Sequence, residues 1–131
     1  MHKILVVDDE VSYRELLKEV FTEQGFHVRT ASGSTDAREI ASTFVPDVLI
    51  VDWMLSDEHD GSAVALLCQQ LNPNVGIVFI SGYPSVGLQA AADEDPSIAW
   101  LPKPFHLDQV MSAVQSISDP LLFPKPSQQL E

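Results

Sequence analysis

The chain has 131 residues, of which 45% are hydrophobic and 8% aromatic, so it fits one compact domain and leaves no room for a second of ordinary size. Seven Lys and Arg residues against 19 Asp and Glu residues give a net charge of −12, which repels nucleic acid backbones and anionic membrane surfaces. The single cysteine, Cys68, excludes an internal disulfide, and no apolar run approaches the roughly 20 residues that cross a bilayer, so we expect a cytoplasmic protein that binds neither nucleic acid nor membrane.

Short apolar runs alternate with amphipathic stretches along the chain. Runs rich in β-branched residues predict buried strands, and apolar residues at helical spacing predict helices. In chain order the sequence predicts strand 4–7, helix 11–24, strand 26–31, helix 34–44, strand 48–51, helix 63–71, strand 77–80, a short helix 84–92, strand 98–101 and helix 107–117. Five such alternations predict an α/β fold, with a parallel sheet covered by helices on both faces.

Two of these helices carry more detailed expectations. The tripeptide Ser34–Asp36 is expected to cap the second helix, because small polar side chains bind the free N–H groups of a helix N-terminus. The third helix is marked by Ala63, Leu66, Leu67 and Leu71 at helical spacing. Cys68 of the same helix is expected to be a buried structural thiol, since no basic neighbour is visible to lower its pKa.

The helical pattern stops at about residue 119. Residues 119–131 consist mainly of proline and polar residues without a helical face. We therefore expect one domain over residues 1–118 and a proline-rich linker or tail over residues 119–131. The terminal Leu130–Glu131 is typical of a cloning remnant and is left out of the fold argument.

Polar side chains follow four of the five predicted strands. The set comprises Asp8, Asp9 and Glu10 after the first strand, Asp52 after the third, Ser81 after the fourth and Lys103 after the fifth. Ligands of open parallel sheets bind at the carboxyl ends of the strands. Clustered carboxylates repel one another and need a cation, and Mg²⁺ prefers carboxylate, carbonyl and phosphate oxygens. The pattern therefore indicates a Mg²⁺ and anion site, although any one of these acids alone would be explained as a turn former or helix cap.

These residues resemble the receiver domain of two-component response regulators, over residues 1 to about 118. The resemblance depends on the acidic pair in Val6–Glu10, the aspartate in Leu49–Trp53, the hydroxyl in Phe79–Gly82 and the lysine in Lys103–Phe105. It implies a flavodoxin-like, doubly wound sheet of five parallel strands in the order 2-1-3-4-5, with five helices. It also implies a cis peptide bond before Pro104.

The resemblance implies a phosphorelay switch rather than an enzyme. Asp52 would accept a phosphoryl group from a histidine kinase or histidine phosphotransfer protein, and self-phosphorylation from small donors and self-dephosphorylation would be its only reactions. Mg²⁺, or Mn²⁺ in its place, would be held by Asp8, Asp9, Asp52 and the backbone carbonyl of Met54. An output domain or effector protein would read the signal, and a homodimer is left open.

Three further side chains receive roles from the same resemblance. Lys103 would pair with the phosphoryl oxygens, while Ser81 and Trp100 would form the switch. Trp100 stands where the family has Tyr or Phe, and we expect its bulk to mute the movement, because the interior is close-packed.

Two departures from the family pattern concern the surroundings of the acceptor. Position 56 is Ser instead of Pro, and Gly61 comes nine residues after Asp52 instead of eight, which predicts a longer and less rigid loop. Met54 and Tyr83 would flank the path of the hydrolytic water. Because neither can orient a water through a carboxylate or amide, we expect a long-lived phosphorylated state.

Two other functions remain open at the level of the sequence. One is a receiver-like interaction module that no longer takes a phosphoryl group. The other is a small Mg²⁺-dependent phosphatase with an aspartate nucleophile, which requires an Asp-x-Asp motif where this chain has the adjacent acids Asp8 and Asp9.

Overall fold

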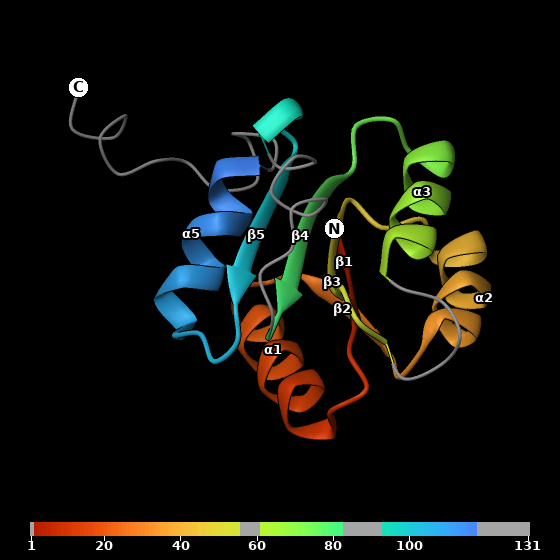
Figure 1. Cartoon of the computed structure of the whole chain (residues 1–131). Coiled ribbons are helices and arrows are strands. Elements are labelled where there is room, and N and C mark those ends of the chain that lie inside the picture. Colours follow the sequence, from red (N-terminus) through yellow and green to blue (C-terminus); the bar gives the residue numbers. More distant parts are fainter. Residues whose placement is uncertain (1, 56–60, 83–92, 118–131) are drawn as a thin grey trace.

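Strands and helices alternate along the chain as the sequence pattern predicts. The structure is a computed structural model that describes residues 2–55, 61–82 and 93–117 (Figure 1). Its strands are β1 (Lys3–Val7), β2 (His27–Ala31), β3 (Val48–Asp52), β4 (Gly76–Ser81) and β5 (Ile98–Pro102). Its helices are α1 (Val11–Glu23), α2 (Ser34–Phe44), α3 (Gly61–Leu71) and α5 (Leu107–Ile117). The expected helix 84–92, the loop at 56–60 and the tail 119–131 lie outside the described residues.

The five strands form one parallel sheet in the order β2-β1-β3-β4-β5. This topology confirms the expected flavodoxin-like, doubly wound fold. The register pairs Val7 with Val51, and it pairs Ser81 with Pro102. The polar residues at or just beyond the strand ends are therefore brought to one edge of the sheet.

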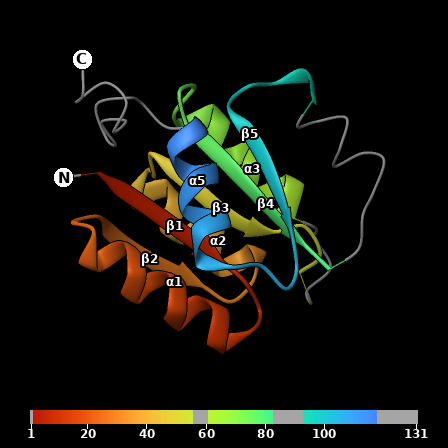
Figure 2. The ribbon, with the colours of Figure 1, turned by 90° about the vertical axis from the view of Figure 1, so that its left-hand side faces the viewer.

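Helices cover both faces of the sheet, and each face has its own core (Figure 2). Alternate residues of a strand enter different cores, as Leu5 and Val7 pack toward α2 and α3, whereas Ile4 and Val6 pack toward α1 and α5. Both sets are at most 1% exposed. This two-sided burial explains why the central strands β1, β3 and β4 are nearly continuous apolar runs, whereas the edge strand β2 alternates exposed and buried residues. Within the described part of the chain, no helix is both long enough and apolar enough to cross a bilayer.

The beginning of α2 differs from the expectation. Gly33 is the N-cap residue and no side chain caps the helix, so the predicted capping by Ser34–Asp36 is wrong. Ser34 is already helical and is fully buried. Ser34 is therefore the first residue of the helix rather than its N-cap.

The buried face of α3 consists of residues other than those that mark the helix in the sequence. Its buried residues are Gly61, Val64, Ala65 and Cys68. Leu66 and Leu71 are 57% and 38% exposed, whereas Leu67 packs against the core. The helix packs on the sheet through its small side chains, which allow a closer approach than leucines do. Cys68 is buried as predicted.

Candidate functional site

Three charged side chains meet at the carboxyl edge of the sheet. The Nζ atom of Lys103 lies 2.9 Å from Oδ2 of Asp8 and 2.9 Å from Oδ2 of Asp52. The side chains of Asp8, Asp52 and Lys103 are only 2%, 8% and 11% exposed. The same ammonium group also lies 3.3 Å from Oε1 of Glu10, which is solvent-exposed. Because buried charges must be paired, the fold holds these groups as one ion-pair network.

Backbone hydrogen bonds hold the two buried carboxylates at the strand ends. The N–H of Asp8 donates to the carbonyl of Ala31 at 3.1 Å, which extends the pairing of β1 with β2 by one residue. Oδ1 of Asp8 accepts the N–H of Glu10 at 2.9 Å, and Oδ1 of Asp52 accepts the N–H of Met54 at 3.0 Å. Each carboxylate is thus held by a turn that it forms with the backbone two residues later.

The backbone of Lys103 is also held at the site. Its N–H donates to the carbonyl of Ser81 at 2.8 Å, just beyond the pairing of β4 with β5. The Lys103–Pro104 peptide bond is cis, which confirms the expectation. The hydrogen bond to Ser81 holds the backbone of Lys103 at the end of β4, and the side chain reaches Asp52 at the end of β3.

The surroundings of Lys103 favour its charged form. Burial alone would lower the pKa of Lys103, but its hydrogen bonds to Asp52 and Asp8 raise that pKa above the ordinary value. Burial raises the pKa of Asp8, although the N–H of Glu10 and the charge of Lys103 oppose this shift. Oδ2 of Asp8 is buried and accepts no hydrogen bond from the described residues, although Nζ of Lys103 lies nearby.

The acidic residues after β1 offer a set of oxygens suited to a hard cation. One oxygen from each of Asp8, Asp9 and Glu10 can lie within 4.8 Å of the others. Oxygen ligands of this kind, with a buried Oδ2 that lacks a hydrogen bond, fit Mg²⁺. Asp52 is linked to the same group through Lys103. Glu10 joins this set although the sequence analysis did not assign it a metal-binding role.

The remaining predicted site residues lie at different depths. Ser81 is 1% exposed at the end of β4, whereas the side chain of Met54 is 59% exposed. Trp100 is half-buried on β5, where it pairs with Phe79 in the register and packs against the core under α2 and α3. Tyr83, which the sequence analysis assigned to the path of the water, lies outside the described residues.

Two residues of α1 contact the site and were missed by the sequence analysis. The ring of Tyr13 lies 4.5 Å from Nζ of Lys103, measured to the ring centroid. The guanidinium of Arg14 donates to the backbone carbonyl of Asp8 at 2.7 Å. The place of these two residues in the sequence could have indicated their role. A helix that begins directly after an acidic strand end turns its first side chains back over that end.

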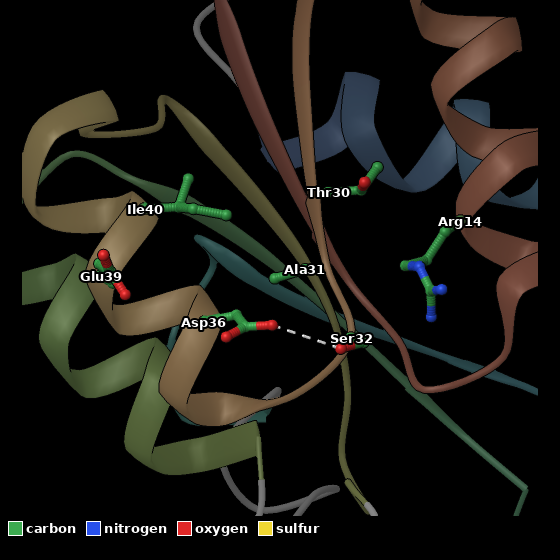
Figure 3. Close-up of a pocket in the computed structure, with 7 residues that line it drawn as sticks. All are labelled: Arg14, Thr30, Ala31, Ser32, Asp36, Glu39 and Ile40. Carbon is green, nitrogen blue, oxygen red and sulfur yellow. Dashed lines mark hydrogen bonds between the residues drawn. The ribbon is translucent and has the colours of Figure 1, made fainter.

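A polar pocket of about 400 Å³ lies between α1 and α2 (Figure 3). Arg14 lines one side of it, and Asp36 and Glu39 of α2 line the other. The hydroxyl of Ser32 donates to Oδ2 of Asp36 at 3.4 Å, at the N-terminus of α2. Since Arg14 also binds the carbonyl of Asp8, this side chain joins the wall of the pocket to the acidic group.

Comparisons with known proteins agree with this geometry. A family model described as the response regulator receiver domain matches residues 4–115. The chain is 26% identical over 113 residues to sporulation initiation phosphotransferase F of Bacillus subtilis, which covers 86% of this chain and 90% of that protein. It is 28% identical over 109 residues to an NtrX-like response regulator of Rickettsia felis, covering 82% of this chain but only 23% of that protein. A receiver protein structure from Sinorhizobium medicae superposes with a TM-score of 0.77 at 30% identity, over 88% of this chain and 93% of that chain.

Proposed function

Because the chain belongs to the response regulator receiver domain family, we propose that it is a phosphorelay switch with Asp52 as the phosphoacceptor. One observation carries the proposal: the buried ammonium of Lys103 pairs with both Asp52 and Asp8 at the carboxyl edge of the sheet. A histidine kinase or a histidine phosphotransfer protein is the donor. An output domain or effector protein is the partner that reads the phosphorylated state.

The transfer step follows from the charges at the site. A carboxylate oxygen of Asp52 forms a bond to phosphorus while the bond between phosphorus and the donor's histidine nitrogen breaks, and the histidine leaves as a neutral imidazole after taking up a proton. Lys103, which holds Oδ2 of Asp52 before the reaction, pairs with the phosphoryl oxygens after it. Positioning and charge stabilisation are the main sources of catalysis in phosphoryl transfer, so a preformed ammonium beside the acceptor serves both purposes.

Asp8, Asp9, Asp52 and the carbonyl of Met54 are the proposed ligands of Mg²⁺, with Mn²⁺ as an alternative ion. The buried Oδ2 of Asp8, which lacks a hydrogen bond, supports this assignment. When bound, the ion supplies positive charge to the phosphoryl oxygens. Glu10 is near enough to Asp8 and Asp9 to take part in place of one of these ligands.

Ser81 and Trp100 are the proposed switch residues, and the size of Trp100 limits how far the switch moves. Both lie at or near the end of neighbouring strands, β4 and β5. The two other functions are less well supported. A phosphatase would need an Asp-x-Asp motif that is absent after β1, and an inert interaction module would not need a buried lysine held between two buried carboxylates.

The test is phosphorylation by acetyl phosphate in the presence of Mg²⁺, measured by mass spectrometry of the intact protein. We expect one added phosphoryl group in the parent protein and none in Asp52→Asn. Asp36→Asn, which removes an exposed carboxylate of α2, is the matched control and should be labelled like the parent. Labelling of Asp52→Asn at the parental level would overturn the assignment of the acceptor.

A further inference from the structure

The ammonium of Lys103 has an uncharged neighbour in addition to its three carboxylates. Its Nζ atom lies 4.5 Å from the centroid of the Tyr13 ring, and the side chain of Lys103 is only 11% exposed. A cation over an aromatic face is attracted by the ring's quadrupole, and the attraction grows where water is excluded. The Tyr13 ring is therefore a fourth contact that holds the lysine at the site.

The ring of Tyr13 also contacts a second aromatic ring. It stacks on Phe105, with ring centroids 5.2 Å apart and an angle of 28° between the ring planes. Phe105 packs against the core between the sheet and α1 and α5. Phe105 follows Lys103 by two residues, so the two side chains that contact the Tyr13 ring come from the same segment of chain. The position of the ring is thus tied to the hydrophobic core.

The ring differs from the carboxylates in what happens to it during the reaction. Asp52 changes from a carboxylate to an acyl phosphate, and the contacts of Lys103 with Asp8 and Asp52 must change accordingly. The Tyr13 ring forms no hydrogen bond with the ammonium that has to break, so it can guide the lysine in both states.

We propose that Tyr13 is a positioning residue that holds Lys103 for phosphoryl transfer through its ring face. The inference rests on the proposed role of Lys103 in the transfer. The part of Tyr13 that acts is the aromatic ring, and the phenolic hydroxyl is not required. Phenylalanine at this position would therefore serve, whereas a branched aliphatic side chain of similar bulk would not.

The first experiment measures the contact itself, without any phosphorylation. The NMR signals of the Lys103 Hε protons are compared in the parent, Tyr13→Leu and Tyr13→Phe. Protons over a ring face are shifted upfield, so the Lys103 signals should move downfield in Tyr13→Leu and stay near the parental position in Tyr13→Phe. Unmoved Lys103 signals in Tyr13→Leu would overturn the proposal, whatever the phosphorylation assays show.

The second experiment measures the consequence for the reaction. With acetyl phosphate and Mg²⁺, Tyr13→Leu should be phosphorylated about five- to tenfold more slowly than the parent, as expected for the loss of one cation–π contact, and Tyr13→Phe should restore the rate. In a Lys103→Met background the Tyr13→Leu change should have no further effect. Urea unfolding of each variant verifies that the fold is retained.

The outcomes separate this proposal from the proposed function. Equal slowing by Tyr13→Leu with and without Lys103 would show that the ring acts independently of the lysine, which overturns the inference. Equal slowing by Tyr13→Phe and Tyr13→Leu would assign the effect to the hydroxyl and also overturn it. If the parent protein takes no phosphoryl group, the proposed function fails, and the NMR shift alone decides whether Tyr13 holds Lys103.

Discussion

Asp8 shows how one residue can combine a structural cost with a functional gain. Its carboxylate is 2% exposed, and a buried charge is costly unless it is paired. Lys103 supplies the paired charge and Glu10 supplies a backbone N–H, yet Oδ2 accepts no hydrogen bond from the described residues. A carboxylate whose charge is already paired, and which still has an oxygen free of hydrogen bonds, suits reversible binding of a metal ion.

Met54 allows a test of how the lifetime of the phosphorylated state is set. Its side chain is 59% exposed two residues after Asp52, and it has no group that could orient a water. Met54→Asn should speed the loss of the phosphoryl group several-fold, because an amide can position the attacking water. The loss is followed by mass spectrometry after removal of acetyl phosphate.

Leu66→Asn is the matched control for Met54→Asn. Leu66 is 57% exposed on α3, so the control adds the same amide at a similarly exposed apolar position. It should leave the rate of phosphoryl loss unchanged. A rate in Met54→Asn that equals or falls below the parental rate would contradict the expectation.

Cys68 predicts a pH dependence of stability. Burial raises the pKa of its thiol from 9.0 to about 11, so the folded protein retains a proton that the unfolded chain releases. The stabilisation is complete below pH 9 and is lost as the pH rises toward 11. The free energy of unfolding should therefore fall by roughly 2–3 kcal/mol over this range from Cys68 alone.

Urea unfolding of the parent and Cys68→Ala at several pH values checks this expectation. The difference between the two proteins removes the contribution of other groups that titrate at high pH. The advantage of the parent over Cys68→Ala should shrink from pH 9 to 11. A constant difference would show that the thiol does not titrate as its burial requires.

At the scale of the elements, the start of α3 is fitted closely to the end of β3. Gly61 begins the helix and donates its N–H to the carbonyl of Trp53 at 2.9 Å. A Cβ atom on Gly61 would overlap the carbonyl oxygen of Asp52 and come within 3.1 Å of Val51. The glycine therefore lets α3 begin directly against the end of β3.

Gly61→Ala should destabilise the protein by about 1–3 kcal/mol, because the methyl group forces backbone apart in a packed region. It should also slow phosphorylation of Asp52 by displacing the end of β3. Gly82→Ala is the matched control, since a Cβ there meets nothing within 4 Å, and we expect a change of less than about 0.5 kcal/mol. Thermal unfolding of both variants distinguishes the two positions, and equal effects would refute the argument from close packing.

At the scale of the whole molecule, the net charge of −12 is concentrated in part at the site. Asp8, Asp9 and Glu10 can bring three carboxylate oxygens within 4.8 Å, which costs stability when no cation is bound. Mg²⁺ that binds only the folded state should raise the stability by about 2.7 kcal/mol at a hundred times its dissociation constant. The carboxylates that would bind Mg²⁺ therefore lower the stability of the protein when the ion is absent.

Asp9→Asn should change the stability of the protein in opposite directions without and with Mg²⁺. In EDTA it should be more stable than the parent by about 0.5 kcal/mol, because an exposed like-charge repulsion is removed. With Mg²⁺ at matched ionic strength the order should reverse, because the variant lacks a metal ligand. Thermal unfolding gives the stabilities, and Trp53 fluorescence in a Trp100→Phe background reports the binding. An equal response of both proteins to Mg²⁺ would contradict the role of Asp9.

The sequence by itself determines the layout of the molecule. Continuous apolar runs locate the central strands β1, β3 and β4 to within about a residue, because a strand buried on both faces has to be apolar throughout. The edge strands β2 and β5 are partly exposed, and their weaker patterns also lie within about a residue of the strands in the structure. Parallel pairing then requires the strand ends to share an edge. The proximity of Asp8, Asp52 and Lys103 therefore follows from residues that are far apart in the chain but occupy equivalent positions in the alternating pattern.

Only the tertiary structure decides which side chains face which neighbours. The periodicity of α3 contains both a leucine stripe and a stripe of small residues, and the close fit of Gly61 against β3 selects the second. Ser34 is a residue type that often caps helices, yet in the structure it is the first residue of α2 and is fully buried. Tyr13 carries no motif, and it reaches Lys103 only because α1 begins at the edge where β5 ends. Local pattern specifies elements, whereas contacts between elements depend on packing distances that no single stretch of sequence contains.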